Sequence, residues 1–121
     1  EIIKKCEDAG IKVKTMFIIG NPEDTKDTIM KTIKYSTLLP SLYAQYSVFT
    51  PYPGTPVYNE FKSLINENRY ENFNQYKLVF NHKYLDSLKV DQLKSLAYFK
   101  FYFNFKRLLK IAVYFFKSKY A

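Results

Sequence analysis

The residues with the clearest potential for chemistry lie in two loops, each of which follows an apolar segment. The first loop reads Gly-Asn-Pro-Glu-Asp-Thr over residues 20–25, and the second reads Pro-Tyr-Pro-Gly-Thr-Pro over residues 51–56. Gly20 would let a ligand approach the backbone closely, and Glu23 offers a carboxylate beside it. A helix that starts after Thr25 would add free amide donors and a positive dipole end. The pattern fits a small-molecule site, but it equally fits ordinary turns after strands.

The apolar segments that precede the loops have the pattern of β-strands. Residues 11–19 alternate at first and end in an apolar run, which predicts a strand whose far end is buried on both faces, and residues 42–49 form a second strand. Between them, residues 25–38 have helical spacing, and Pro40 ends this helix. Strand–helix–strand order predicts two parallel strands joined by a right-handed crossover. Both loops then leave the sheet at the carboxyl ends of the strands, where parallel α/β folds bind their ligands.

The start of the chain indicates that it is a piece of a larger α/β enzyme. Residues 1–9 have the pattern of the end of an amphipathic helix, closed by Gly10, with no capping residue before it and no initiator Met. Two parallel strands also need covered faces and neighbouring strands to be stable. We therefore expect further strands upstream.

The charge is distributed unevenly along the chain. The net charge is +8, and residues 83–121 hold nine of the 19 Lys and Arg residues but only two of the 11 Asp and Glu residues. The first part is thus nearly neutral and the last part is strongly basic. The single cysteine, Cys6, excludes an internal disulfide and favours a reducing compartment, so we expect a cytoplasmic protein, with membrane contact at most at the surface.

The basic tail is also rich in aromatic residues. Residues 89 to about 117 contain no Gly or Pro and predict one long helix, in which residues 98–105 are apolar nearly all round. Three interpretations remain open, in order of preference. The tail is a core helix that closes the open side of the fold, an amphipathic helix whose residues 98–121 contact an anionic membrane surface, or a nucleic-acid surface. We do not expect nucleic acid to be the partner.

With both loops in view, the chain resembles the C-terminal part of a radical SAM catalytic core. Residues 16–23, Met-Phe-Ile-Ile-Gly-Asn-Pro-Glu, match three of the four specified positions of the family pattern GxIxGxxE, with Met16 in place of the first glycine. The segments 10–14 and 51–58 add to the likeness, which covers residues 1 to about 60 well and the tail only loosely. It is strongest toward the cobalamin-associated branch that includes the anaerobic magnesium-protoporphyrin monomethyl ester cyclases.

The resemblance implies an α/β fold that is the C-terminal portion of a partial (β/α)6 barrel, with two parallel strands followed by a helical tail. Residues 1–62 would belong to the barrel core, residues 63–88 would form an irregular connector, and residues 89–121 would form the basic aromatic tail. It implies S-adenosylmethionine and a [4Fe–4S] cluster as cofactors, which together generate a 5′-deoxyadenosyl radical. Whether the parent protein also binds cobalamin is left open.

The resemblance also assigns cofactor-binding residues, without a catalytic side chain or a metal ligand in this chain. Ile18 would pack against the adenine, Gly20 would admit the cofactor, and Thr50 and Pro51 would contact it through their backbones. The remaining two assigned residues, Asn21 and Glu23, belong to the same motif, and Glu23 is expected to order the loop.

In this family the cluster is held by CxxxCxxC, whose thiolates suit iron–sulfur clusters, and Cys6 fits no such spacing. We therefore expect this chain to be inactive alone, within a parent oxidoreductase or methyltransferase whose upstream part binds a small-molecule substrate. The only histidine, His82, is expected at the surface. The alternative is a non-catalytic α/β binding module whose basic aromatic helix docks a membrane surface or a polyanion.

Overall fold

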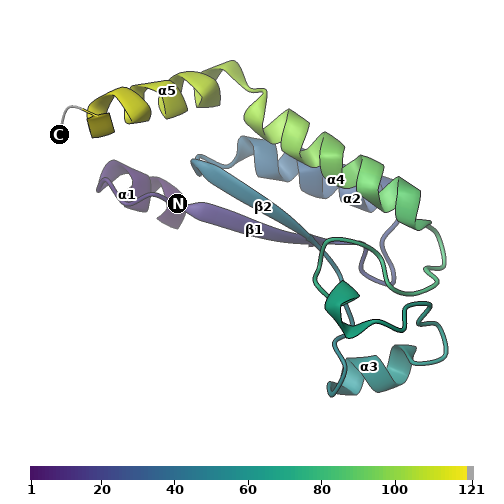
Figure 1. Cartoon of the computed structure of the whole chain (residues 1–121). Helices are drawn as coiled ribbons and strands as arrows, with labels where there is room; N and C mark the ends of the chain where they lie inside the picture. The colour runs from purple at the N-terminus through teal and green to yellow at the C-terminus, as the bar shows by residue number, and fades with distance from the viewer. Residues whose placement is uncertain (120–121) are drawn as a thin grey trace.

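The computed structural model describes residues 1–119, with side chains to residue 116; residues 120 and 121 of the expected tail lie outside the described part (Figure 1). The elements follow one another as α1 (Ile2–Asp8), β1 (Lys14–Ile19), α2 (Lys26–Leu38), β2 (Tyr43–Val48), α3 (Pro56–Phe61), the 3-10 turn η1 (Tyr70–Asn72), α4 (Ser87–Tyr102) and α5 (Phe105–Lys119).

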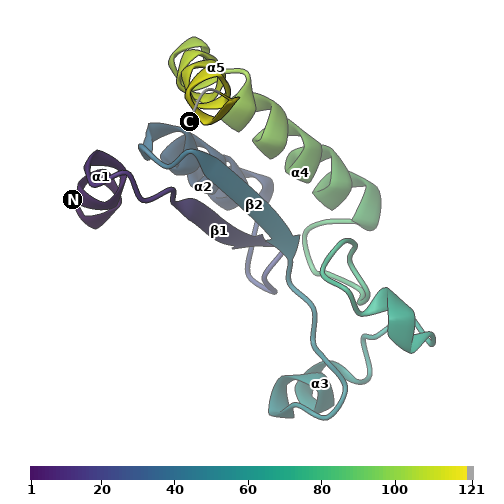
Figure 2. The same cartoon turned by 60° about the vertical axis from the view of Figure 1, so that its left-hand side comes forward.

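The sheet confirms the expected strand–helix–strand unit. β1 and β2 are parallel and pair from Lys14 with Tyr43 to Ile19 with Val48, and α2 makes the crossover between them. One face of this sheet packs against α2 and α4, as two views of the chain show (Figures 1 and 2). The core lies between these layers. Its buried residues are Ile19, Ile29, Ile33, Ala44, Tyr46, Val48, Leu78, Phe80, Leu85, Val90, Leu93, Ala97 and Phe101.

The opposite face of the sheet is uncovered over β1, whereas Ser47 of β2, on the same face, is only 6% exposed. Met16 and Ile18 point to this side, and their side chains are 62% and 58% exposed. The expectation that the end of β1 is buried on both faces is therefore wrong for the described chain, because α2 and α4 both pack against the same face. The exposed apolar side chains make this face suited to contact with another apolar group.

The outer edge of β2 is closed by two tyrosines of α4. The hydroxyl of Tyr102 lies 3.1 Å from both the N and the O of Ala44, and the hydroxyl of Tyr98 lies 3.1 Å from the N and 3.5 Å from the O of Tyr46. Farther along the strand, the amide of Val48 donates to the carbonyl of residue 75 at 2.8 Å. A further strand cannot pair with this edge while these bonds are made.

The segment between α3 and α4 has little regular structure, and it contributes to the core. It contains η1 and one isolated antiparallel bridge, between Ile65 and Phe80. Phe80 is buried in the core with Leu78 and Leu85. This segment therefore packs against the first 50 residues and returns the chain to the sheet for α4.

The predicted single helix from residue 89 to 117 is wrong, because two helices occupy this range. α4 ends at Tyr102, and Asn104 caps the start of α5, since its Oδ1 accepts from the amide of Lys106 at 3.1 Å. The carbonyl of Asn104 also accepts from the amides of Arg107 and Leu108, at 3.0 and 2.9 Å. The break needs neither Gly nor Pro. No helix in the described part of the chain is long and apolar enough to cross a membrane.

Candidate functional site

Both candidate loops leave the same end of the sheet, the one at which the two parallel strands have their carboxyl ends (Figure 1). Ile19 pairs with Val48, and the amide of Phe49 continues the ladder with a 2.9 Å bond to the carbonyl of Ile19. Gly20 and Thr50 therefore begin their loops from neighbouring strands. This arrangement follows from the parallel pairing, and it places the two sequence motifs next to each other at the carboxyl end of the sheet.

The first loop is held in shape by Asp24. Its Oδ2 accepts from the backbone amide of Asn21 at 2.9 Å and from the side-chain amide of Asn21 at 3.1 Å, while its Oδ1 accepts from the hydroxyl of Thr28 at 2.8 Å. The amide of Asp24 in turn donates to the carbonyl of Asn21 at 2.8 Å. The sequence motif carries this turn, but the importance of Asp24 to it was not predicted.

The helix after the loop begins with a capping box. Thr25 is the N-cap of α2, and Thr25 and Thr28 each accept from the other's backbone amide through their hydroxyls. The carboxylate of Asp24 takes no part in this box, because it accepts hydrogen bonds from Asn21 and Thr28.

Gly20 is required by the backbone conformation. Its φ is +74°, a left-handed conformation that residues with a Cβ adopt at a cost. A Cβ at this position would point into the core and lie 3.6 to 3.8 Å from side-chain carbons of Val48, Val90 and Leu78, which is ordinary contact. On that side the glycine adjoins packed core, so its assignment to a cofactor site stays a prediction.

His82 anchors the first loop from a distant part of the chain. Its Nε2 lies 2.7 Å from the carbonyl of Asn21, and its Nδ1 accepts from the amides of Tyr84 and Leu85 at 3.1 and 3.2 Å. Because Nδ1 is the acceptor of two backbone donors, the hydrogen lies on Nε2, which donates to Asn21. His82 is half-buried, and the expectation of a simple surface histidine overlooked this role. Only the fold brings residues 21 and 82 together, so no local sequence signal could have found it.

Two of the assigned residues have different surroundings. Ile18 lies on the uncovered face of the sheet, next to Met16. Glu23 is exposed and lines a cavity of about 300 Å³ with Pro22, Phe61, Leu64, Phe80, Asn81 and Lys83, and Ile18 is not part of its lining. A hydrogen bond with Tyr84 and, to a smaller extent, the charge of Glu23 raise the pKa of Lys83.

The second loop is a turn that leads into α3. The hydroxyl of Thr50 donates to the carbonyl of Val48 at 3.1 Å, and Pro51 is fully buried. Gly54 has a φ of +87°, and Thr55 caps α3 by accepting from the amide of Tyr58 at 3.2 Å. The proline and glycine residues of this motif therefore shape a tight turn and a helix start.

A metal centre is not built by the described residues. Residues 1–119 contain no group of three or more His, Cys, Asp or Glu side chains that could hold a metal ion. Cys6 is free and half-buried on α1, which lies at the opposite end of β1 from the candidate loops. The thiolates that a [4Fe–4S] cluster requires are therefore not supplied by this part of the chain.

Comparison with curated proteins shows similarity to methyltransferases and to a cyclase. An uncharacterised methyltransferase of Pyrococcus horikoshii is 30% identical over 112 residues, which is 91% of this chain and 24% of that protein. The bacteriochlorophyllide d C-8(2)-methyltransferase of Chlorobaculum tepidum is 26% identical over 116 residues, 94% of this chain and 26% of that protein. The anaerobic magnesium-protoporphyrin IX monomethyl ester cyclase of Cereibacter sphaeroides is 28% identical over 74 residues, 61% of this chain and 12% of that protein.

The chain thus spans about a quarter of the length of the two methyltransferases and less of the cyclase. No family model matches it. The likeness to the cyclase agrees with the branch toward which the sequence motifs point.

Proposed function

We propose that this chain supplies the S-adenosylmethionine-binding end of a radical SAM catalytic core. The observation that carries the proposal is that the GxxE loop and the PYPGTP loop both leave the carboxyl end of two parallel strands, beside the exposed apolar side chains of Met16 and Ile18. The similarity to two methyltransferases and a cyclase supports the same conclusion, since one of these relatives is a member of the branch that the motifs resemble.

The residues at the carboxyl end of the sheet suit both the apolar adenine ring of S-adenosylmethionine and its polar groups. Ile18 offers an exposed apolar side chain on the uncovered face for the flat adenine, as the resemblance implies. The backbone of the Gly20 loop and of Thr50 and Pro51 offers polar groups beside it. Asp24 and His82 hold the first loop in one conformation, which lowers the entropy that a ligand must remove on binding.

S-adenosylmethionine, when bound, would supply a methyl group or, with one electron from the [4Fe–4S] cluster of the parent protein and release of methionine, a 5′-deoxyadenosyl radical. The residues of this chain would bind and orient it. They do not fit the second cofactor, because the described residues contain no cluster-binding set. The ligands of the [4Fe–4S] cluster, the substrate contacts and any cobalamin site therefore belong to other parts of the parent protein.

The partial barrel is also a proposal, and the two edges of the sheet support it. The outer edge of β2 is closed by Tyr98 and Tyr102, so the sheet can grow only past β1. In a parallel pair the backbone groups of Met16 and Ile18 point away from β2 and are suited to pair with a further strand. The uncovered face, with these same two side chains, would then line the interior of the barrel.

The coding sequence upstream of this chain tests the proposal. We expect it to encode, in the same reading frame, a CxxxCxxC motif in a loop that follows a strand. We also expect the complete gene product, purified without oxygen, to show the absorption of a [4Fe–4S] cluster. A complete reading frame that lacks these cysteines would contradict the proposal.

A further inference from the structure

The polar side of α5 is fastened to the body of the protein. Arg107, which is only 7% exposed, donates to the carbonyls of Leu39, Ser41 and Phe101 at 2.8, 3.3 and 2.6 Å. Its guanidinium also lies 3.5 Å from the ring centre of Phe101. Breaking the three hydrogen bonds of this buried guanidinium would cost much free energy. These hydrogen bonds therefore fix the rotation of α5 about its own axis.

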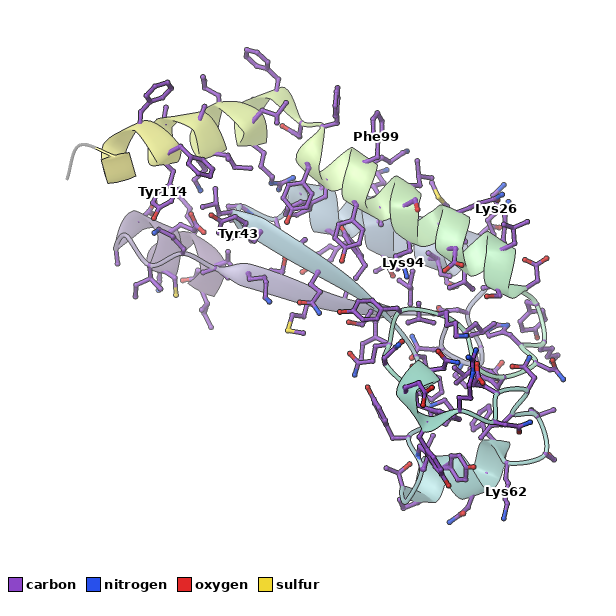
Figure 3. All side chains as sticks on the ribbon, in the orientation of Figure 1. Lys26, Tyr43, Lys62, Lys94, Phe99 and Tyr114 are labelled. Carbon is purple, nitrogen blue, oxygen red and sulfur yellow. The ribbon has the colours of Figure 1, made fainter. Side chains whose placement is uncertain are left out.

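Two further contacts act in the same direction along the helix. Lys110 donates to the carboxylate of Glu7 at 2.7 Å and to the carbonyl of Pro40 at 3.2 Å. One turn later, Lys12 contacts Tyr114, on the side of α5 that faces α1 (Figure 3). The side chains of α5 that point toward the protein are therefore Arg107, Lys110 and Tyr114, which an isolated amphipathic helix would direct to water.

The apolar side of α5 consequently faces outward. Phe105, Leu109 and Phe116 follow one another at helical spacing on this side, and they are 80%, 56% and 68% exposed. Further exposed apolar side chains flank them on the same side of the helix, and these are Leu108, Val113 and Phe115. In the part of the chain that the structure describes, nothing covers them.

The apolar surface continues onto α4. Phe99 and Phe103 stack with ring centres 4.8 Å apart and are 58% and 72% exposed. Phe99 points outward from α4, away from the sheet (Figure 3). We call the outward side chains of α5, together with Phe99 and Phe103, the aromatic stripe. It is larger than the scattered single apolar residues of an ordinary protein surface.

The charge beside the aromatic stripe decides what fits it. The sequence has no Asp or Glu after Asp91, while it has seven Lys and Arg residues in the same range. Lys100 and Lys106 are exposed and border the stripe. Pairing two copies through α5 would bring like charges together, whereas an anionic phospholipid surface accepts the apolar side chains and attracts the cations. An α5 of about 22 Å would lie in the plane of that surface.

We propose that α5 and the last turn of α4 dock on an anionic phospholipid surface through the aromatic stripe. α5 contacts Lys12 and the residues before β2, so it lies at the end of the sheet where the strands begin. The two candidate loops lie at the opposite end and stay accessible when the stripe is bound (Figure 1). The docking surface is thus independent of the cofactor proposal, and either can fail without the other.

Flotation of the chain with lipid vesicles tests the docking proposal. We expect the chain to float with vesicles of phosphatidylcholine and phosphatidylglycerol and not with vesicles of phosphatidylcholine alone. The double variant Phe105→Ser/Phe116→Ser should bind at least about ten-fold more weakly, because it loses the apolar area that inserts. The matched control Tyr70→Ser/Tyr76→Ser removes two aromatic side chains that are 75% and 71% exposed but lie outside the stripe, and it should bind as the parent chain does.

A charge pair of variants keeps the test independent of folding defects. Lys106→Glu reverses an exposed charge at the border of the stripe and should weaken binding several-fold, whereas Lys62→Glu, at the far end of the molecule, should not. Circular dichroism checks that all four variants keep their helix content. Three results overturn the proposal: no flotation with anionic vesicles, equal flotation with neutral ones, or a dimer in sedimentation that Phe105→Ser/Phe116→Ser abolishes while flotation is unchanged.

Discussion

The hydroxyl of Tyr102 stands in for a neighbouring strand at Ala44, since it lies 3.1 Å from both the N and the O of that residue. Tyr98 does the same at Tyr46, and the two phenol rings are stacked at 6°. The match is geometric. Four residues of helix rise about 6 Å, and two residues of strand span about 6.6 Å. A hydroxyl both donates and accepts, so each tyrosine satisfies an amide and a carbonyl together.

Removing the two hydroxyls should both destabilise the chain and reopen the edge of β2. We expect Tyr98→Phe/Tyr102→Phe to lower the free energy of unfolding by about 2–4 kcal/mol, because backbone groups of Ala44 and Tyr46 lose their partners. The exposed edge should then favour self-association. Urea unfolding measures the first effect, and sedimentation measures the second.

The control for this change is the loss of two phenol hydroxyls at exposed positions. Tyr35 and Tyr76 are 59% and 71% exposed, so Tyr35→Phe/Tyr76→Phe should leave both measurements unchanged. If the Tyr98→Phe/Tyr102→Phe variant unfolds at the same urea concentration as this control and stays monomeric, the tyrosines do not close the edge.

His82 should determine how rigid the first loop is. We expect His82→Ala to speed hydrogen exchange at the amide of Asp24 by about ten-fold or more, because the carbonyl of Asn21 that this amide donates to loses its second donor. The substitution Tyr70→Leu, at a tyrosine that is 75% exposed and away from the first loop, is the control and should leave this exchange rate unchanged. Equal rates in the two variants would mean that the His82 contact does not hold the loop.

Gly20 should respond to substitution as a conformational glycine. Gly20→Ala is expected to cost about 1–2 kcal/mol of unfolding free energy, the usual cost of a left-handed residue with a Cβ. Gly10 is the matched control, since its φ is +80° and a Cβ there would meet nothing within 4 Å. Gly10→Ala should therefore cost a similar amount in urea unfolding. A much larger cost at Gly20 would mean that the core beside it does not accept a methyl group.

Glu67 should make the stability of the chain depend on pH in acid. Its carboxylate accepts from the amide of Arg69, from Lys77 and from Asn72, at 3.0, 2.9 and 2.7 Å, and the first of these bonds contributes most to lowering its pKa from 4.5 to about 2. Because the folded state holds this proton less tightly than the unfolded state, the stabilisation is complete above about pH 5 and falls as the pH drops toward 2.

The substitution Glu67→Gln isolates this contribution. It should remove part of the loss of unfolding free energy between pH 6 and pH 3, on the order of one proton's worth of pH dependence. Glu60→Gln changes an exposed glutamate on α3 and serves as the control. A Glu67→Gln variant with the same pH dependence as Glu60→Gln would show that the carboxylate of Glu67 titrates alike in both states.

The parts of the fold that the sequence predicted are those that local patterns determine. Spacing within segments of 6 to 13 residues predicts the two parallel strands and α2. The placement of both loops at the carboxyl end of the sheet follows from these elements. The break at Asn104 was missed because an asparagine inside a helical pattern is a weak signal, and its backbone bonds decide whether it caps. The exposed face of β1 was missed because an apolar run does not specify how many layers cover it.

The parts of the site that could not be predicted rest on contacts between distant residues. Tyr98 and Tyr102 meet β2 across 52 and 58 positions, and His82 meets Asn21 across 61. Their residue types are common in helices and loops, so their roles appear only once the chain is folded. The motif residues, by contrast, were found in sequence because turns need particular residues at particular positions.

The central claim is that the carboxyl end of the sheet, where both loops begin, binds S-adenosylmethionine. The affinity of the complete gene product for S-adenosylmethionine tests this claim most directly. We predict that Ile18→Glu weakens S-adenosylmethionine binding at least about ten-fold in equilibrium dialysis, because it places a charge where the adenine would pack. Ile11 is equally exposed, at 59%, but precedes β1 at the other end of the sheet, so Ile11→Glu should bind as the unchanged protein does. If Ile18→Glu and Ile11→Glu bind S-adenosylmethionine alike, or if the unchanged protein does not bind it, the account is contradicted.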